Sequence, residues 1–228
     1  MPHSISPEEQ YLIYMKQLRD ELNTAYTHYE IAKSIREFQH TRPSDFNEAI
    51  TFFQVTQNAN LFATIISIFR FIDTRTDTMQ LHGFFELVRN SLDLFSTQAY
   101  RKRLEQVGRD AEDINHWTQL HVEITKEAVD TDEERVRNLP VTNLIKWRHK
   151  KLAHLDKERA LNEVDVMQEN PITVQEIDDI LTTLDEILNH YSIAYDGVQW
   201  AIGLPPVRPQ MEYIMDSIKY NRESKRHR

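Results

Sequence analysis

The chain has 228 residues, of which 40% are hydrophobic and 28% are charged, a balance typical of a globular protein and not of a disordered or membrane-spanning one. It contains no cysteine, which excludes disulfides, thiolate catalysis and cysteine zinc sites, and only 4 glycines, which favours long helices with few tight turns. Its net charge of −9 argues against sequence-blind binding to nucleic acid, which depends on neutralising phosphates with Lys and Arg.

The N-terminal half is predicted to form three amphipathic helices. Ser6 can accept hydrogen bonds from first-turn amides, and Pro7 is tolerated there, so a first helix is expected over about residues 7–40. After a polar break, apolar residues at helical spacing predict a second helix and its core face: Ile50, Phe53, Leu61, Ile65, Ile68 and Ile72. A third helix follows the polar connector 73–78 and carries Leu81, Phe84, Phe85, Val88, Leu92 and Phe95.

The central part of the chain is predicted to contain a more exposed helix, a break and a well-defined helix. From 97 to about 130, a thin apolar stripe in a strongly charged sequence predicts one partly exposed helix. Pro140 should kink or restart any helix in the next segment. Residues 157–172 are expected to form a loop, and Thr173 with Glu176 is a capping-box pattern that opens a clear amphipathic helix.

The C-terminal residues are predicted to form an arm on a helical bundle. Residues 200–206 are apolar and proline-rich, a short helix is expected over 209–220, and 221–228 is expected to be a disordered basic tail. The predicted fold class is therefore all-α. We expect an up-and-down helical bundle over residues 1–197, followed by a C-terminal arm, short helix and tail over 198–228.

The sequence gives no sign of a membrane span or of secretion. The longest mostly apolar run, 61–69, is interrupted by Thr64 and Ser67 and is far shorter than the roughly 20 residues that cross a bilayer. The first residues lack the basic start and apolar centre of a secretory signal. We therefore expect a cytoplasmic protein.

Charge is distributed unevenly along the chain. Residues 109–134 hold nine acids against two bases, and 163–186 hold eight acids with no Lys or Arg. By contrast, 146–157 holds five bases against Asp156 alone. This stretch is a candidate positive site on an acidic body.

The basic stretch concentrates groups that suit a phosphodiester substrate: Arg148, His149, Lys150, Lys151 and His154. A histidine can take a proton from a ribose 2′-hydroxyl, and an arginine can bind phosphate oxygens in a fork. The alternative is a solvated helix face, which is the usual role of a charge run. On a regular helix Arg148 and His154 lie about 240° apart, so they would meet only through a distorted helix end, the reach of the arginine, or a second subunit.

Other signals of chemistry are weaker. The common nucleotide-binding and zinc-hydrolase motifs are absent, and the pairs His116 and His121, and His149 and His154, are spaced poorly for chelation, so no metal or cofactor is expected. The tryptophans are expected to be core residues rather than base-stacking ones: Trp117, Trp147 and Trp200. Two further basic clusters, 101–103 and 225–228, are interpreted as solvated charge rather than as an RNA track.

Residues 147–156 closely resemble the signature of HEPN domains, in which an arginine is followed after four to six residues by a histidine. The match is best with the AbiU-type branch, which is linked to bacterial abortive infection. Two further segments agree with that branch: 67–73 with the following Asp77 and Thr78, and 188–191. The resemblance covers roughly residues 10–195.

This resemblance implies a helical bundle that forms a homodimer in which the motifs of both subunits face a shared cleft. In active members the cleft is a metal-independent endoribonuclease site. By analogy, His154 would act in acid–base catalysis at the 2′-hydroxyl and Arg148 would hold the scissile phosphate. His149 stands where the family more often has Asn or Asp. The neighbouring lysines would contact RNA: Lys146, Lys150, Lys151 and Lys157.

Two hypotheses follow from these observations. The first is a dimeric HEPN ribonuclease that acts as a toxin or abortive-infection effector in bacterial defence, with RNA as substrate and a cognate antitoxin protein as a candidate partner. The second is a catalytically inactive helical module that binds RNA or a protein.

Overall fold

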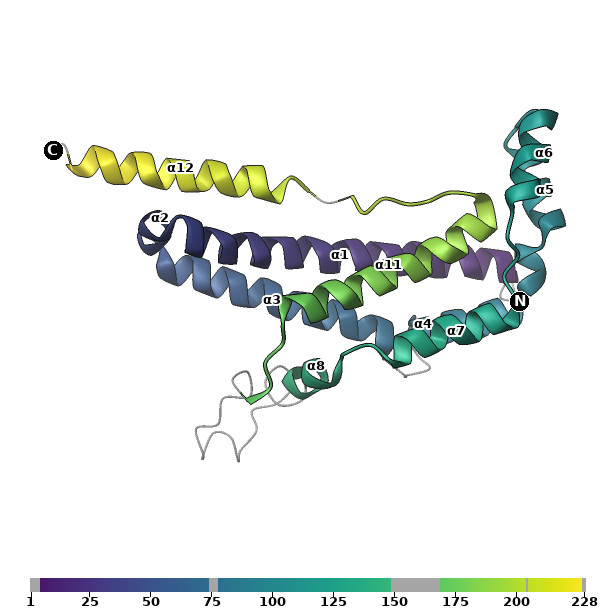
Figure 1. The fold of residues 1–228 in the computed structure, drawn as a ribbon, viewed down its shortest axis with the longest axis horizontal. Helices are drawn as coiled ribbons and strands as arrows, with labels where there is room; N and C mark the ends of the chain where they lie inside the picture. The colour runs from purple at the N-terminus through teal and green to yellow at the C-terminus, as the bar shows by residue number, and fades with distance from the viewer. Residues whose placement is uncertain (1–4, 74–77, 149–168, 204, 227–228) are drawn as a thin grey trace.

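The computed structural model describes residues 5–73, 78–148, 169–203 and 205–226. Every regular element in those ranges is helical, which confirms the predicted all-α class (Figure 1). The helices are α1 (Pro7–Thr41), α2 (Pro43–Asn47), α3 (Ile50–Ile72), α4 (Leu81–Arg89), the 3₁₀ helix η1 (Leu92–Phe95), α5 (Thr97–Gln106), α6 (Ala111–Leu120), α7 (Lys126–Arg137), α8 (Thr142–Trp147), α11 (Val174–Asp196) and α12 (Val207–Arg226). No helix within these ranges is long and apolar enough to span a membrane.

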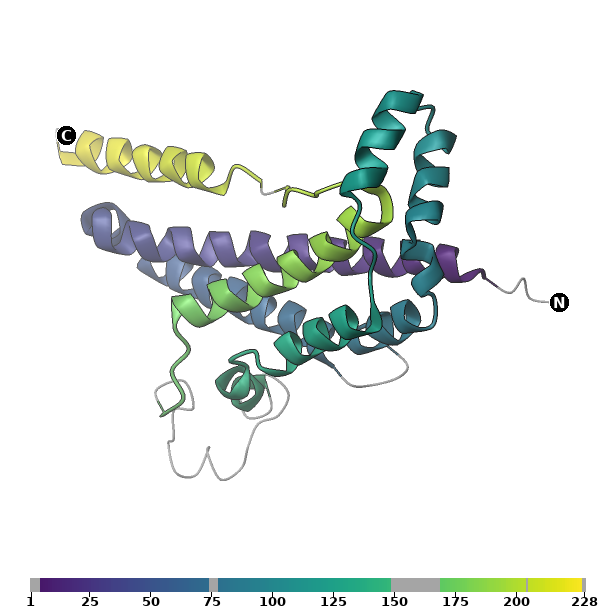
Figure 2. The same cartoon turned by 45° about the vertical axis from the view of Figure 1, so that its right-hand side comes forward.

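The bundle is organised around the long helix α1. Helix α3 runs beside α1, α11 crosses it, and α4 packs against α7 below them (Figures 1 and 2). The core between these helices is rich in buried aromatic rings: Tyr11, Phe84, Phe85, Phe95 and Tyr191. Tyr11 meets Phe95 edge to face at 5.2 Å, and Phe84 meets Tyr191 in the same way at 5.0 Å. Such pairs add about 0.5–1.5 kcal/mol each beyond their buried area, so the first holds η1 on α1 and the second holds α4 on α11.

Helix starts that were predicted from capping residues are confirmed. Ser6 and Glu9 form a reciprocal capping box at the start of α1, and Thr173 and Glu176 form one at the start of α11. These side chains satisfy backbone N–H groups that have no partner inside the helix. Gly197 ends α11 with φ of 75°, a left-handed conformation that glycine adopts without steric cost.

The single helix predicted from residue 97 to about 130 is wrong. The chain instead forms α5, a turn at Gly108 with φ of 77°, helix α6, an extended link, and then α7. Asp110 caps α6 and Thr125 caps α7, each accepting a backbone N–H. Helices α5 and α6 pair through a small core of their own and rise as a hairpin from one end of the bundle (Figure 2). Each short helix buries one face, so apolar residues keep a helical spacing across both breaks. That continuous spacing hid the two breaks in the sequence pattern.

The C-terminal helix is longer than predicted. Helix α12 covers Val207–Arg226, so the expected short helix over 209–220 and the disordered tail from 221 are both corrected. It packs on α1 and α2, where Met211 and Met215 are buried, and Arg222 forms an ion pair of 3.0 Å with Asp45 of α2. This packing stabilises the added helical turns. The division of the chain at residue 197 stays a prediction.

The expected core residues are confirmed only in part. Trp147 is 4% exposed, as predicted, but Trp117 is 44% exposed and Trp200 is 54% exposed. Ile50, expected in the core face of α3, is 41% exposed. Trp200 lies in the arm after α11, where its ring covers the guanidinium of Arg19 at 4.3 Å. Apolar neighbours in the sequence therefore did not show whether these side chains are buried. Their burial depends on which helix packs over them.

Candidate functional site

Helix α8 positions the arginine of the HEPN-like motif. The helix begins after Pro140, as predicted, and buries Leu144 and Trp147 against the bundle. The Trp147 indole Nε1–H donates to the backbone O of Asn170 at 2.7 Å. These contacts attach α8 to the segment that leads into α11, and Arg148 follows as the C-terminal cap.

Arg148 lies against the C-terminal end of α3. Its guanidinium carbon is 4.9 Å from the centre of the Phe69 ring, and its Nη2 is 3.9 Å from Oδ2 of Asp73. The side chain is 38% exposed. The ring contact contributes about 0.5–1 kcal/mol at such a site, and the ion pair is at the limit of its range. Neither contact is a short hydrogen bond, so among the described residues these partners leave the guanidinium with donors for an incoming phosphate.

The other predicted site residues are placed differently or fall outside the description. Lys146 donates from Nζ to Oδ1 of Asn170 at 2.8 Å, on a side of α8 roughly 200° from Arg148. The structure therefore does not bring these two cations together. The remaining predicted residues lie outside the described ranges: His149, Lys150, Lys151, His154 and Lys157. The proximity of Arg148 and His154 stays a prediction.

A cleft of about 430 Å³ lies between the end of α3 and helices α4, α7 and α8. This volume is within the range of small-molecule binding pockets, roughly 300–1,000 Å³. Its walls are mainly apolar, and four polar or charged side chains also line it: Asp73, His82, Glu133 and Arg137. Asp73 also borders a second cleft, of about 290 Å³, between α1 and α3. The sequence did not predict either cleft.

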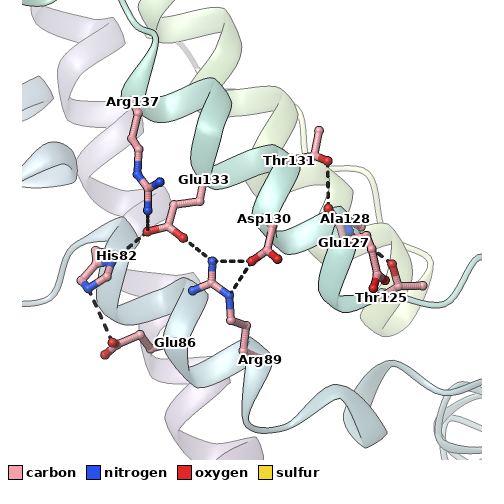
Figure 3. A network of polar contacts seen from close by, with 10 residues as sticks. All are labelled: His82, Glu86, Arg89, Thr125, Glu127, Ala128, Asp130, Thr131, Glu133 and Arg137. Carbon is pink, nitrogen blue, oxygen red and sulfur yellow. Dashed lines mark hydrogen bonds and ion pairs between the residues drawn. The ribbon is translucent and has the colours of Figure 1, made fainter.

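The polar side of the larger cleft is an ion-pair network on α4 and α7 (Figure 3). Glu133 is 10% exposed and accepts from Arg137 at 2.8 Å, from His82 at 3.0 Å, and from Arg89. Burial alone would raise the pKa of the Glu133 carboxyl, but hydrogen bonds from Arg89, His82 and Arg137 outweigh it and lower the pKa to about 2. Glu133 therefore stays ionised and holds His82 and Arg137 at the edge of the cleft, with Arg89 bound on its other oxygen.

The neighbouring residue on α7 makes a second network. Asp132 is buried, and its Oδ2 lies 2.7 Å from Nδ1 of His190 on α11, while its Oδ1 accepts from Arg135 at 3.1 Å. His190 belongs to the segment 188–191 that resembles the AbiU-type branch. In the sequence, Asp132 and Glu133 are part of an excess of negative charge. Their ion pairs could not be predicted, because the arginine and histidine partners lie on other helices or one turn away.

His121, a candidate metal ligand, and Arg103 of the basic cluster on α5 both contact other parts of the bundle. The described part of the chain contains no group of three or more His, Asp or Glu side chains that could hold a metal ion. His121 stacks on Tyr100 at 4.4 Å and lies 2.9 Å from the carbonyl O of Ala194. Arg103 donates to two backbone carbonyls and covers the Tyr195 ring at 3.9 Å. Arg103 thus joins α5 to α11, in place of the solvated charge that was expected.

Comparison with known proteins gives one informative result. A family model described as AbiU2, for a group of HEPN domains, matches residues 9–219. No curated protein and no solved structure matches the chain. The matched range includes Arg148, the α3 residues that contact it, and the described part of α8.

Proposed function

This chain belongs to the AbiU2 family of HEPN domain proteins, a family related to abortive infection, and from that premise we propose that it is a metal-independent endoribonuclease. The observation that carries the proposal is the position of Arg148. This arginine of the motif is half-exposed at the end of α8, oriented by Phe69 and Asp73. A guanidinium held in this way can bind a phosphodiester without first losing a short hydrogen bond to Asp73.

The proposed reaction uses the RNA's own 2′-hydroxyl as nucleophile. His154 takes the proton from the 2′-hydroxyl, and the 2′-oxygen attacks the adjacent phosphorus. The bond from phosphorus to the 5′-oxygen breaks, and that oxygen takes a proton from a water molecule and leaves as a 5′-hydroxyl. The proton held by His154 returns to the hydroxide that remains. Arg148 binds the phosphate oxygens as negative charge develops on them. The products are a 2′,3′-cyclic phosphate end and a 5′-hydroxyl end.

The proposed biological setting is bacterial defence in the cytoplasm. The protein would act as a toxin or effector, its substrate would be RNA, and a cognate antitoxin protein would restrain it. Two copies would build the site together, because residues 148 and 154 face in different directions on a regular helix and a second subunit can complete the pocket. Lys150, Lys151 and Lys157 would add phosphate contacts around it, and Lys146, on another side of α8, would contact RNA away from the pocket.

We expect the purified protein to cleave single-stranded RNA in the presence of EDTA. The fragments should carry 2′,3′-cyclic phosphate ends, as measured by mass spectrometry. A double variant, Arg148→Ala with His154→Ala, purified in the same way, should give no fragments, whereas His40→Ala at an exposed position near the end of α1 should cleave as wild type does. Equal fragments from wild type and double variant would reveal a contaminating nuclease. No cleavage by any of them would favour the inactive RNA-binding or protein-binding module.

We also expect the protein to be a dimer in solution at micromolar concentration. Light scattering coupled to gel filtration should give about twice the chain mass of 27.1 kDa. A dimer is expected because the proposed site is shared between two subunits. This measurement does not require the RNA substrate to be known. A mass equal to one chain at every concentration tested would contradict the two-subunit site.

A further inference from the structure

Helix α3 carries two rows of apolar side chains. One row, which includes Phe53, Ile65 and Ile68, is buried in the bundle, where α1 runs beside α3 (Figures 1 and 2). The other row, which we call the α3 seam, repeats in alternating steps of three and four residues: Phe52, Val55, Ala59, Phe62, Ile66 and Phe69. This spacing is the one with which two helices pack along their length. A helix that is apolar on two sides is usually covered on both.

The α3 seam is exposed over most of its length. Phe52 is 62% exposed, Val55 is 63% exposed and Ile66 is 43% exposed. Ala59, between them, is exposed as well. Monomeric proteins rarely expose long apolar rows, and such rows mark interaction sites. The seam is therefore a candidate docking surface for another molecule.

One end of the α3 seam lies at the proposed phosphate site. Phe69, its last residue, is only 5% exposed and lies beneath the guanidinium of Arg148, 4.9 Å from the ring centre. Asp73, one turn further, lies 3.9 Å from the same guanidinium. At about 100° per residue, Phe69 and Asp73 both lie within about 60° of Ile66 around the helix. A molecule seated on the seam is therefore brought up to Arg148.

The charge of α3 favours a second copy of the chain over RNA. Between Ile50 and Ile72, Arg70 is the only charged residue, and it is paired with Glu21 at 2.9 Å. RNA binding depends on Lys and Arg, which this surface does not offer along the seam. Two copies that each carry a net charge of −9 repel one another, and an uncharged row lets them meet without opposing like charges.

The direction of the two α3 helices decides whether two Arg148 side chains come together. In an antiparallel pair centred on Ala59, the two copies of Phe69 would lie about 30 Å apart, at a rise of about 1.5 Å per residue. In a parallel pair, each seam residue faces its own copy across helix axes about 8–10 Å apart. Both Arg148 side chains then lie at the same end of the dimer. Only the parallel pair agrees with a site shared by two subunits.

We propose that the α3 seam is the homodimer interface, with the two α3 helices parallel and a two-fold axis running along them. Such an interface is self-complementary, because the same patch is used on both subunits. The inference rests on the proposed function, since the shared site sets the direction of the helices.

Single-cysteine variants test the direction, because the chain has no cysteine of its own. Val55→Cys and Ile66→Cys should each give a disulfide-linked dimer on mild oxidation, as seen by non-reducing electrophoresis. In the antiparallel pair, the copies would lie about 12 Å apart at residue 55 and about 21 Å apart at residue 66, beyond the roughly 7 Å limit of a disulfide. Gln54→Cys is the control: it is exposed on α3, about 100° away from Val55, and should stay a monomer on the gel.

A charge placed in the α3 seam tests the interface without cross-linking. Val55→Glu sets two carboxylates opposite each other, so it should weaken dimerisation at least about 100-fold. Light scattering coupled to gel filtration over a range of concentrations measures the loss. Gln54→Glu adds the same charge beside the seam and should leave dimerisation unchanged within about threefold.

The outcomes separate the interface from the nuclease activity. A wild-type monomer, a dimer that Val55→Glu leaves intact, or cross-linking at Ala59→Cys but not at residues 55 and 66 would overturn the inference. If wild type also cleaves RNA in those cases, the nuclease proposal stands and its site is assembled in another way. If residues 55 and 66 both cross-link but wild type cleaves no RNA, the interface stands and the nuclease proposal fails.

Discussion

Arg148→Ala is expected to slow RNA cleavage by roughly 10²- to 10³-fold, which is the usual effect of removing one group that stabilises negative charge in a transition state. The guanidinium should matter more as charge develops on the phosphate than it does for binding the uncleaved RNA. Most of the loss should therefore appear in kcat and less in KM. Single-turnover cleavage of a short oligonucleotide at several enzyme concentrations measures both.

The fold should tolerate this substitution. Arg148 is 38% exposed and its ion pair with Asp73 spans 3.9 Å, so its removal should cost no more than about 1 kcal/mol of unfolding free energy. Arg148→Lys should recover part of the rate, because it keeps the charge but loses the planar fork. Arg101→Ala, at an exposed ion pair with Glu105, serves as the control and should leave the rate unchanged. If Arg148→Ala lowers the unfolding free energy by as much as it raises the activation free energy of cleavage, Arg148 has a structural role instead.

Local signals made parts of the fold predictable from the sequence. The capping boxes at Ser6 and Thr173 and the break at Pro140 depend on residues within four positions of each other, and all three agree with the structure. The break at Gly108 had local signals too, a glycine followed by the cap Asp110. It was missed because the apolar spacing continues from one short helix into the next.

Long-range contacts account for what the sequence did not reveal. The last turns of α12 are stabilised by packing on α1 and α2 and by the ion pair between Arg222 and Asp45, which no local pattern indicates. In the same way, the motif identified Arg148, but its neighbours Phe69 and Asp73 come from a different helix. The cleft beside them exists only because four helices meet there, so no single segment could have predicted it.

Glu133→Gln is expected to lower the unfolding free energy by roughly 3–4 kcal/mol at pH 7. Hydrogen bonds from Arg89, His82 and Arg137 outweigh burial and lower the pKa of the Glu133 carboxyl from 4.5 to about 2, and each pKa unit is worth about 1.4 kcal/mol. Glutamine keeps the shape of the side chain but cannot balance the charges of Arg89 and Arg137. Urea unfolding followed by circular dichroism measures the difference.

The pH dependence of this difference provides the stronger test. Because the folded pKa lies below the unfolded one, the ionised carboxylate contributes its full stabilisation above pH 4.5 and loses it as the pH falls towards 2. Wild type and Glu133→Gln should therefore converge in stability between pH 4.5 and pH 2. The control is Glu134→Gln, one residue along α7 at an exposed position, which should stay within about 0.5 kcal/mol of wild type at neutral pH. If the two variants unfold at the same urea concentration at pH 7, Glu133 does not hold the arginines beside the cleft in the way its hydrogen bonds indicate.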